Sequence, residues 1–217
     1  MLQLYYSPMA CSLASRIALM EAGLEARYHS VHLWKKTVIA TGDDFRTVSV
    51  KGAVPVLVLD DGQKLTESAA VLQYIADRRP DLGLAPPPDD PDRYRLQEWL
   101  SFVGTEIHKA FLFPTFWYAD DAAKAAARGR IGQSVGVVAA HLADRPYLVG
   151  DRFTVADAHL TWALLLLKFG GVDTAQWPVL VDYLNRMLQR PQVRAAVAIE
   201  REESKALQQA RSAPVAG

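Results

Sequence analysis

The sequence predicts an α/β domain over residues 1–80, a linker over residues 81–91 and an all-helical domain over residues 92–217. In the first part, short apolar runs alternate with apolar residues at helical spacing, which is typical of an α/β domain. The stretch PDLGLAPPPDDP then interrupts both patterns, and proline-rich stretches form stiff linkers. Beyond it, apolar residues recur at helical spacing only.

The chain of 217 residues is long enough to bury a sizeable core, and its formal net charge is zero. This balance gives no electrostatic steering toward nucleic acid or an anionic membrane. The longest strongly apolar segment, Leu160–Phe169, is too short to span a bilayer. We therefore expect neither nucleic acid nor a membrane as a partner.

The only cysteine is Cys11, which excludes an internal disulfide and fits a reducing compartment. A metal site built from several cysteines is excluded too, and we expect no bound metal. The N-terminal residues lack the basic and apolar regions of a signal peptide, so we expect a cytoplasmic protein.

The first elements place Cys11 where a strand ends and a helix begins. The apolar run Leu2–Tyr6 predicts a buried strand, Ser7-Pro8 ends it, and helical spacing continues from Leu13 to Gly23. A thiol at a helix N-terminus is stabilised as the thiolate by the macrodipole and unpaired N–H groups, which lowers its pKa. The alternative is a small buried apolar residue.

The remaining elements of the first domain follow in order. Strands are expected over Ala26–Leu33, Val54–Leu59 and Lys64–Thr66, and a helix from Glu67-Ser68 to a stop before Pro80. Residues 34–50 form a polar loop with room for one helical turn, and Asp60-Asp61-Gly62 is a hairpin turn. The order βαβ followed by ββα is the thioredoxin-like arrangement.

Proline cannot donate to a sheet ladder, so Pro55 belongs at a strand start. A cis Val54–Pro55 bond turns the Val54 backbone groups outward, toward an extended peptide-like ligand. An ordinary trans bond is the alternative.

The second domain is expected to hold five helices. They cover Asp92–Tyr118 with a break near Pro114, Asp120–Asp144, Thr154–Phe169, Pro178–Gln189 and Pro191–Lys205. Thr154 and Asp157 have the spacing of a capping box.

Five motifs in order carry a resemblance that spans nearly the whole chain. They are Ala10-Cys11-Ser12-Leu13-Ala14, Lys51-Gly52-Ala53-Val54-Pro55, Leu65-Thr66-Glu67-Ser68, Glu106-Ile107-His108-Lys109 and the run from Gly150 to Asp157. With them, the chain resembles the cytosolic glutathione transferases, most closely the bacterial beta class. The resemblance implies the glutathione-transferase fold, a homodimer, and glutathione as co-substrate with no other cofactor.

The resemblance also implies how glutathione is held. The backbone of Val54, with Pro55 cis, binds the cysteinyl part; Ser68 holds the γ-glutamyl carboxylate, with Glu67 near the amine; Lys36, or alternatively Lys35, reaches the glycyl carboxylate. The start of a helix suits an anion. The alternative for Glu67 and Ser68 is that they only cap the helix.

Cys11 and His108 are the implied catalytic residues. Cys11 is expected beside the glutathione sulfur, where the resemblance implies a mixed disulfide and thiol–disulfide or peroxidase-like chemistry. Ser12 and Tyr6 are further donors in reach of that sulfur. His108 is expected to face the thiol and to titrate near neutrality.

Thr105 and Lys109 are expected to flank the same site as His108. Two positions depart from the family pattern: Ser101 stands in place of an asparagine, and Met9 in place of a glycine. An aromatic cluster near the end of the long helix is expected in the core, with the electrophile pocket as the alternative. Its members are Phe111, Phe113, Phe116, Trp117 and Tyr118.

The implied reaction is attack of the glutathione thiolate on a small hydrophobic electrophile. A dehalogenase, an ether-cleaving enzyme or an isomerase would share the same glutathione site. A non-catalytic glutathione-binding or regulatory protein is an alternative of another class, because fold alone does not settle function.

Overall fold

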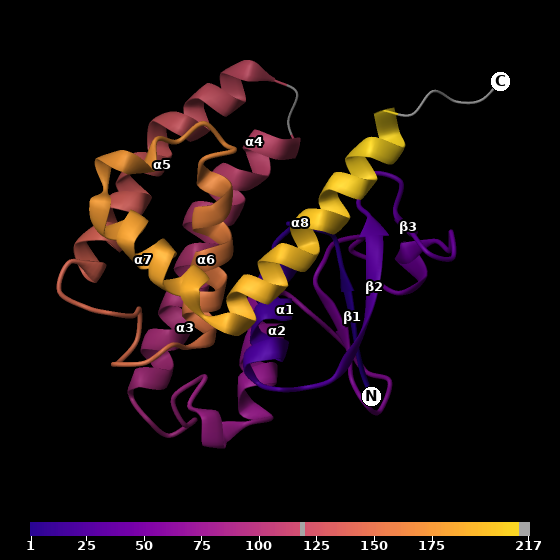
Figure 1. Cartoon of the computed structure of the whole chain (residues 1–217), viewed down its shortest axis with the longest axis horizontal. Coiled ribbons are helices and arrows are strands. Elements are labelled where there is room, and N and C mark those ends of the chain that lie inside the picture. The colour runs from indigo at the N-terminus through magenta and orange to yellow at the C-terminus, as the bar shows by residue number, and fades with distance from the viewer. Residues whose placement is uncertain (118–119, 213–217) are drawn as a thin grey trace.

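The computed structural model describes residues 1–117 and 120–212 (Figure 1). The first part holds β1 (Leu2–Tyr6), α1 (Ser12–Glu21), β2 (Ala26–His32), β3 (Thr37–Val38), η1 (Phe45–Thr47), β4 (Val56–Val58), β5 (Lys64–Thr66) and α2 (Ser68–Asp77). The second part holds η2 (Pro80–Leu82), α3 (Asp92–Phe102), η3 (Val103–Leu112), α4 (Phe113–Trp117), α5 (Asp121–Leu142), α6 (Val155–Leu167), η4 (Thr174–Gln176), α7 (Pro178–Gln189) and α8 (Pro191–Ser212).

The strands form one mixed sheet in the order β3-β2-β1-β4-β5, in which only β1 and β2 are parallel. Side chains alternate across β1 as a strand requires. Leu2, Leu4 and Tyr6 belong to the main core, whereas Tyr5 stacks on the ring of Phe45 on the opposite face. The sheet order and the helix positions confirm the predicted thioredoxin-like arrangement.

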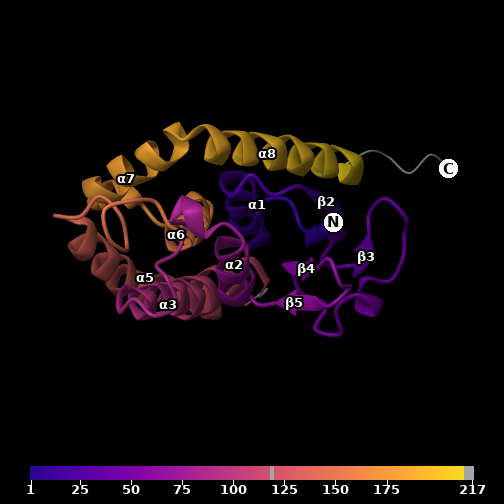
Figure 2. The same ribbon diagram turned by 90° about the horizontal axis from the view of Figure 1, so that it is seen from below.

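Helix α1 lies at the centre of the molecule. It contacts α2, α6 and α8, so the α/β part and the helical part share one core. Figure 2 shows α8 running along α1 toward the sheet. Helix α1, which begins directly after Cys11, is therefore held by helices from both parts of the chain.

The long helix expected over residues 92–118 is divided into three parts. Between α3 and α4 the chain forms a π-helix, η3, which carries the His108 motif. Wider turns of this kind are rare and cannot be read from apolar spacing. Pro114 lies at the start of α4, near the predicted break. Strand β3 was not predicted, and α8 continues past Lys205 to Ser212.

The predicted capping box at the start of α6 is confirmed. The Asp157 carboxylate accepts hydrogen bonds from the Thr154 N–H at 2.8 Å and from the Thr154 hydroxyl at 3.0 Å. Its other oxygen accepts from the Leu148 N–H at 3.0 Å and from the Tyr183 hydroxyl at 2.7 Å. This fully buried carboxylate therefore ties α6 to α7 and to the preceding connector.

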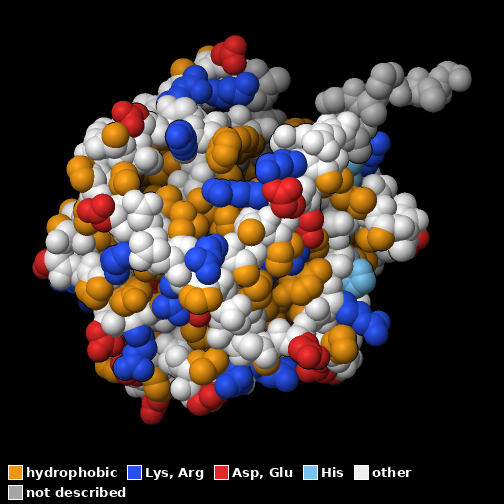
Figure 3. Space-filling view, in the orientation of Figure 1, with side chains coloured by type: hydrophobic (Ala, Val, Ile, Leu, Met, Phe, Trp, Pro, Cys, Tyr) orange, Lys and Arg blue, Asp and Glu red, His pale blue; other side chains and the backbone are white. Residues whose placement is uncertain are grey.

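Charged side chains of both signs are interspersed on the face shown in Figure 3, and no large patch of one sign forms there. Across the described ranges 1–117 and 120–212, none of the helices combines the length and the apolar character needed to cross a membrane. The limits of the two domains, residues 1–80 and 92–217, stay predictions.

Candidate functional site

The turn between β1 and α1 is held by its own hydrogen bonds. The Ala10 N–H donates to the Ser7 carbonyl at 2.9 Å. The Ser12 hydroxyl accepts from the Ser7 N–H at 3.1 Å and donates to the Ser7 carbonyl at 3.3 Å. Because Ser12 is fully buried and its hydroxyl serves the turn, we remove it from the expected glutathione contacts.

The Cys11 thiol is 7% exposed and donates to the Val54 carbonyl, with 3.1 Å between Sγ and the oxygen. Burial raises the pKa of Cys11 to about 11, against the opposing effects of the Lys109 charge, the Ser68 side chain and local backbone N–H groups. The prediction of a lowered pKa from the helix terminus is therefore wrong. Burial outweighs the macrodipole here.

The peptide bond between Val54 and Pro55 is cis, as predicted. The Val54 carbonyl faces the Cys11 thiol, so the backbone segment expected to bind a peptide-like ligand lies directly beside the cysteine.

Glu67 precedes α2 with φ at 69°, in the left-handed region, and its side chain makes no capping hydrogen bond. Its carboxylate instead accepts a hydrogen bond from Lys51 Nζ at 2.7 Å, which lowers the pKa of Glu67. Ser68 is the first residue of α2, where unpaired backbone N–H groups suit a carboxylate ligand. This geometry disfavours simple capping by Glu67.

Lys51 belongs to the second of the five motifs but was not among the expected site residues. Its ammonium also donates to the Thr66 hydroxyl at 2.9 Å, so it spans the loops before β4 and after β5. The sequence signal for Lys51 was a positive residue close to Val54-Pro55. Its partners, Thr66 and Glu67, could not be predicted, because they depend on how β4 and β5 pair.

Lys36 Nζ donates to the Gly52 carbonyl at 2.7 Å, and burial lowers the pKa of Lys36. Lys36 is therefore directed toward the segment that leads to Val54, whereas Lys35 is exposed. This favours Lys36 over the alternative Lys35 as the contact for a glycyl carboxylate.

His108 projects from η3, half-buried, and its ring meets the ring of Trp162 at 82° with centroids 4.8 Å apart. Burial and the Lys109 charge lower the pKa of His108 to about 4, with Glu67 acting in the opposite direction. The imidazole is thus neutral at pH 7, and the expected titration near neutrality is wrong. A neutral imidazole retains one nitrogen that accepts a proton.

Lys109 is exposed, and its Nζ lies 4.9 Å from the centroid of the Phe113 ring. Thr105 is exposed too, and its hydroxyl donates to the Ser101 carbonyl at 3.1 Å, one turn earlier. The charge of Lys109 acts on both Cys11 and His108, so the structure brings these three residues together.

Tyr6 does not join them. It is 4% exposed, and the Arg16 guanidinium lies 4.4 Å from its ring centroid. Burial and the Glu203 carboxylate raise the pKa of Tyr6. Because its hydroxyl is engaged by α8, we also remove Tyr6 from the expected glutathione contacts.

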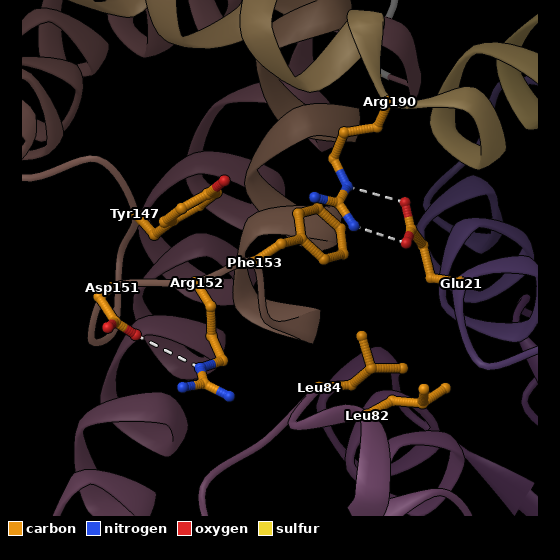
Figure 4. Close-up of a pocket in the computed structure, with 8 residues that line it drawn as sticks. All are labelled: Glu21, Leu82, Leu84, Tyr147, Asp151, Arg152, Phe153 and Arg190. Carbon is orange, nitrogen blue, oxygen red and sulfur yellow. Dashed lines mark hydrogen bonds and ion pairs between the residues drawn. The ribbon is translucent and has the colours of Figure 1, made fainter.

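A cavity of about 290 Å³ lies away from this site, and Figure 4 shows the residues that line it. Two of them, Arg190 and Glu21, form an ion pair at 2.7 Å. None of the candidate residues lines this cavity. A second cavity, of about 280 Å³, lies between η3 and α5, and Phe111 is one of the residues that line it.

The aromatic cluster divides between the two expectations. Phe111 is buried in the core as predicted, whereas Phe113 lies under Lys109 and Phe116 is 43% exposed. The side chain of Trp117 and all of Tyr118 lie outside the described part of the chain. Phe113 is therefore the cluster member that adjoins the candidate site.

Comparison with known proteins identifies the family. Residues 8–78 match the profile "Glutathione S-transferase, N-terminal domain", and residues 103–191 match the corresponding C-terminal domain. The chain is 38% identical over 205 residues to glutathione S-transferase GstA of Escherichia coli, which covers 92% of this chain and 98% of that protein. The chain belongs to the glutathione S-transferase family.

Solved structures agree with this assignment. A sphingomonad glutathione S-transferase complexed with glutathione is 44% identical, with a TM-score of 0.87, over 91% of this chain and 98% of that one. The bacterial beta class glutathione S-transferase of Sphingomonas chungbukensis is 43% identical, with a TM-score of 0.88 and the same coverage. These similarities confirm the family and the resemblance to the bacterial beta class.

Proposed function

We propose that this member of the family is a glutathione transferase whose reaction takes place between Cys11 and His108, on a small hydrophobic electrophile. One observation carries the proposal. The Cys11 thiol, the Val54 carbonyl, the start of α2 at Ser68 and the Lys109 charge converge on one place.

The binding of glutathione follows from the groups around Cys11. The first backbone N–H groups of α2 and the Ser68 hydroxyl hold the γ-glutamyl carboxylate, and Glu67 faces the amine. The backbone of Val54 pairs with the cysteinyl peptide groups, and Lys36 approaches the glycyl carboxylate.

The chemistry follows from two protonation states. Cys11 keeps its proton at neutral pH, so it acts as an S–H donor to the glutathione sulfur and stabilises the thiolate. His108 is neutral and accepts the proton that the glutathione thiol loses. The thiolate then forms a carbon–sulfur bond with the electrophile, and the leaving group departs with its electron pair. Thr105 and Lys109 flank the electrophile.

Redox chemistry at Cys11 is a second candidate, favoured by the position of the sole cysteine beside Val54. The small fraction of Cys11 that has lost its proton to water attacks one sulfur of oxidised glutathione, breaks its S–S bond, forms a mixed disulfide and releases one glutathione thiolate. Cys11→Ala should leave glutathione binding largely intact and abolish this adduct, as measured by mass spectrometry. An adduct that persists in Cys11→Ala contradicts the role of the cysteine.

A glutathione-affinity column combined with a chlorodinitrobenzene assay tests the main proposal. Retention with turnover is the expected result. Retention without turnover over a panel of electrophiles indicates a binding or regulatory protein, and turnover of halides, ethers or isomerisable substrates alone indicates a specialised relative. Loss of both retention and turnover refutes the glutathione site.

We further propose that the protein is a cytoplasmic homodimer without nucleic-acid or membrane partners. The neutral net charge and the interspersed charges of Figure 3 support the second point. Size-exclusion chromatography with light scattering tests the dimer, and a mass of one chain contradicts it.

A further inference from the structure

Met9, two residues before Cys11, has φ at 64°. This left-handed region costs any residue with a Cβ steric energy, and glycine is the usual occupant. A methionine there needs contacts that hold it in place.

Both backbone groups of Met9 are bound by the helical part of the chain. The Met9 N–H donates to Glu200 Oε2 of α8 at 2.8 Å, and the Met9 carbonyl accepts from Trp162 Nε1 of α6 at 3.2 Å. The two partners are 191 and 153 residues away in the sequence. We refer to these two hydrogen bonds as the Met9 clamp.

Each partner of the clamp is itself fixed. Glu200 is fully buried, and its other oxygen accepts from Arg16 Nε at 2.9 Å. The Arg16 guanidinium lies 4.1 Å from the centroid of the Tyr28 ring, which holds it in place. A rigid acceptor therefore faces the Met9 N–H.

Trp162 connects the clamp to the other side of the site. The Trp162 side chain is 2% exposed. Its ring centroid lies 4.8 Å from that of His108, and its indole N–H donates to the Met9 carbonyl. The buried ring of His159 stacks against the Trp162 ring, with 5.7 Å between the ring centroids and 18° between the ring planes. Trp162 thus touches the turn of Cys11 and the His108 ring at the same time.

We propose that Trp162 and Glu200 are positioning residues, which hold Met9 in its left-handed conformation and so fix Cys11 relative to His108. The effect of the distance between Cys11 and His108 on catalysis rests on the proposed function. The clamp itself rests only on the contacts of Met9.

The test uses Trp162→Phe, which removes the indole N–H and keeps an aromatic ring beside His108. Trp177→Phe, at the start of α7, is the matched control. Alkylation of the sole cysteine by iodoacetamide, followed by mass spectrometry, reports on the turn without any need for glutathione. Loss of one hydrogen bond should speed alkylation of Trp162→Phe roughly fivefold, and Trp177→Phe should stay within about twofold of the unmodified protein.

A rescue experiment separates positioning from general stability. Glycine adopts positive φ without steric cost, so in a Met9→Gly background Trp162→Phe should change the alkylation rate less than about twofold. A full fivefold effect in that background overturns the clamp, and so does a Trp162→Phe rate no faster than that of Trp177→Phe.

Two further measurements complete the test. In the unmodified protein, hydrogen exchange at the Met9 amide should be slow because Glu200 binds it, and exchange at the rate of an open loop contradicts the clamp. With glutathione and an electrophile, Trp162→Phe should lower kcat with little change in KM for glutathione. If the unmodified protein turns over no electrophile, the proposed function fails, while alkylation and exchange still decide the clamp.

Discussion

The protonation of Cys11 can be tested directly, because the chain has one cysteine. A pKa of about 11 leaves about one thiol in 1,000 ionised at pH 8, since the difference is three pH units. In the unfolded chain, where the cysteine titrates near pH 9, about a tenth of the thiol is ionised at that pH. The native protein should therefore be alkylated about 100-fold more slowly than the same protein in guanidinium chloride from ionisation alone.

Lys109→Met is the informative perturbation. Lys109 is the strongest influence that lowers the pKa of Cys11, so its removal should move the titration above that of the unmodified protein. Lys124→Met, on α5, is a matched control with the same change of side chain. The assay follows thiolate absorbance in the ultraviolet against pH, because limited access slows alkylation at every pH but leaves the midpoint unchanged.

The raised pKa also affects stability. The folded state keeps the Cys11 proton up to about pH 11, while the unfolded state loses it near pH 9. The protonated thiol therefore adds about 2.7 kcal/mol to the free energy of unfolding, which corresponds to the difference of two pH units. This stabilisation is fully present below pH 9 and is lost as the pH rises to 11. A midpoint below pH 8 in the folded protein refutes the argument that burial dominates, and no shift in Lys109→Met refutes the effect of the Lys109 charge on Cys11.

Three other outcomes are expected. Asp157→Asn should lower the free energy of unfolding by about 2–4 kcal/mol in urea, because buried donors such as the Tyr183 hydroxyl and two N–H groups lose charged acceptors. In the pH profile of kcat/KM, His108 should give an inflection near pH 4 and none between pH 6 and 8; an inflection near 6.5 that disappears in His108→Gln contradicts this. Lys51→Met should lower the free energy of unfolding by less than about 1 kcal/mol, because the ion pair between Lys51 and Glu67 is exposed. The same substitution should weaken glutathione binding measured by calorimetry, and an unchanged affinity excludes Lys51 from the site.

The sequence predicted local structure well where the signal is local. The apolar run Leu2–Tyr6 is β1 with the same bounds, and the hairpin strand Lys64–Thr66 is β5. The capping pair of Thr154 and Asp157 is confirmed as well. Each of these depends on neighbours within a few residues.

The chemistry of the site was harder to predict, because it depends on contacts between distant segments. The position of Cys11 at a helix start predicted a low pKa, but its burial against Val54, 43 residues away, reverses the direction. The hydroxyl of Ser12 was expected to face a ligand, but it binds the turn itself. The widened turns of η3 left no periodic signal of their own.

The departure at Met9 was visible in the sequence, whereas its consequence was not. The sequence showed only that a methionine stands where the family pattern has a glycine. The structure shows a residue in the left-handed region bound by Trp162 and Glu200, which only the packing of α6 and α8 brings there.

A crystal structure with bound glutathione tests the central claim most directly. The account predicts that the glutathione sulfur lies within hydrogen-bond distance of Cys11 Sγ, with the γ-glutamyl carboxylate at the start of α2 beside Ser68. Glutathione bound with its sulfur away from Cys11, or in the cavity between Arg190 and Arg152, would contradict it.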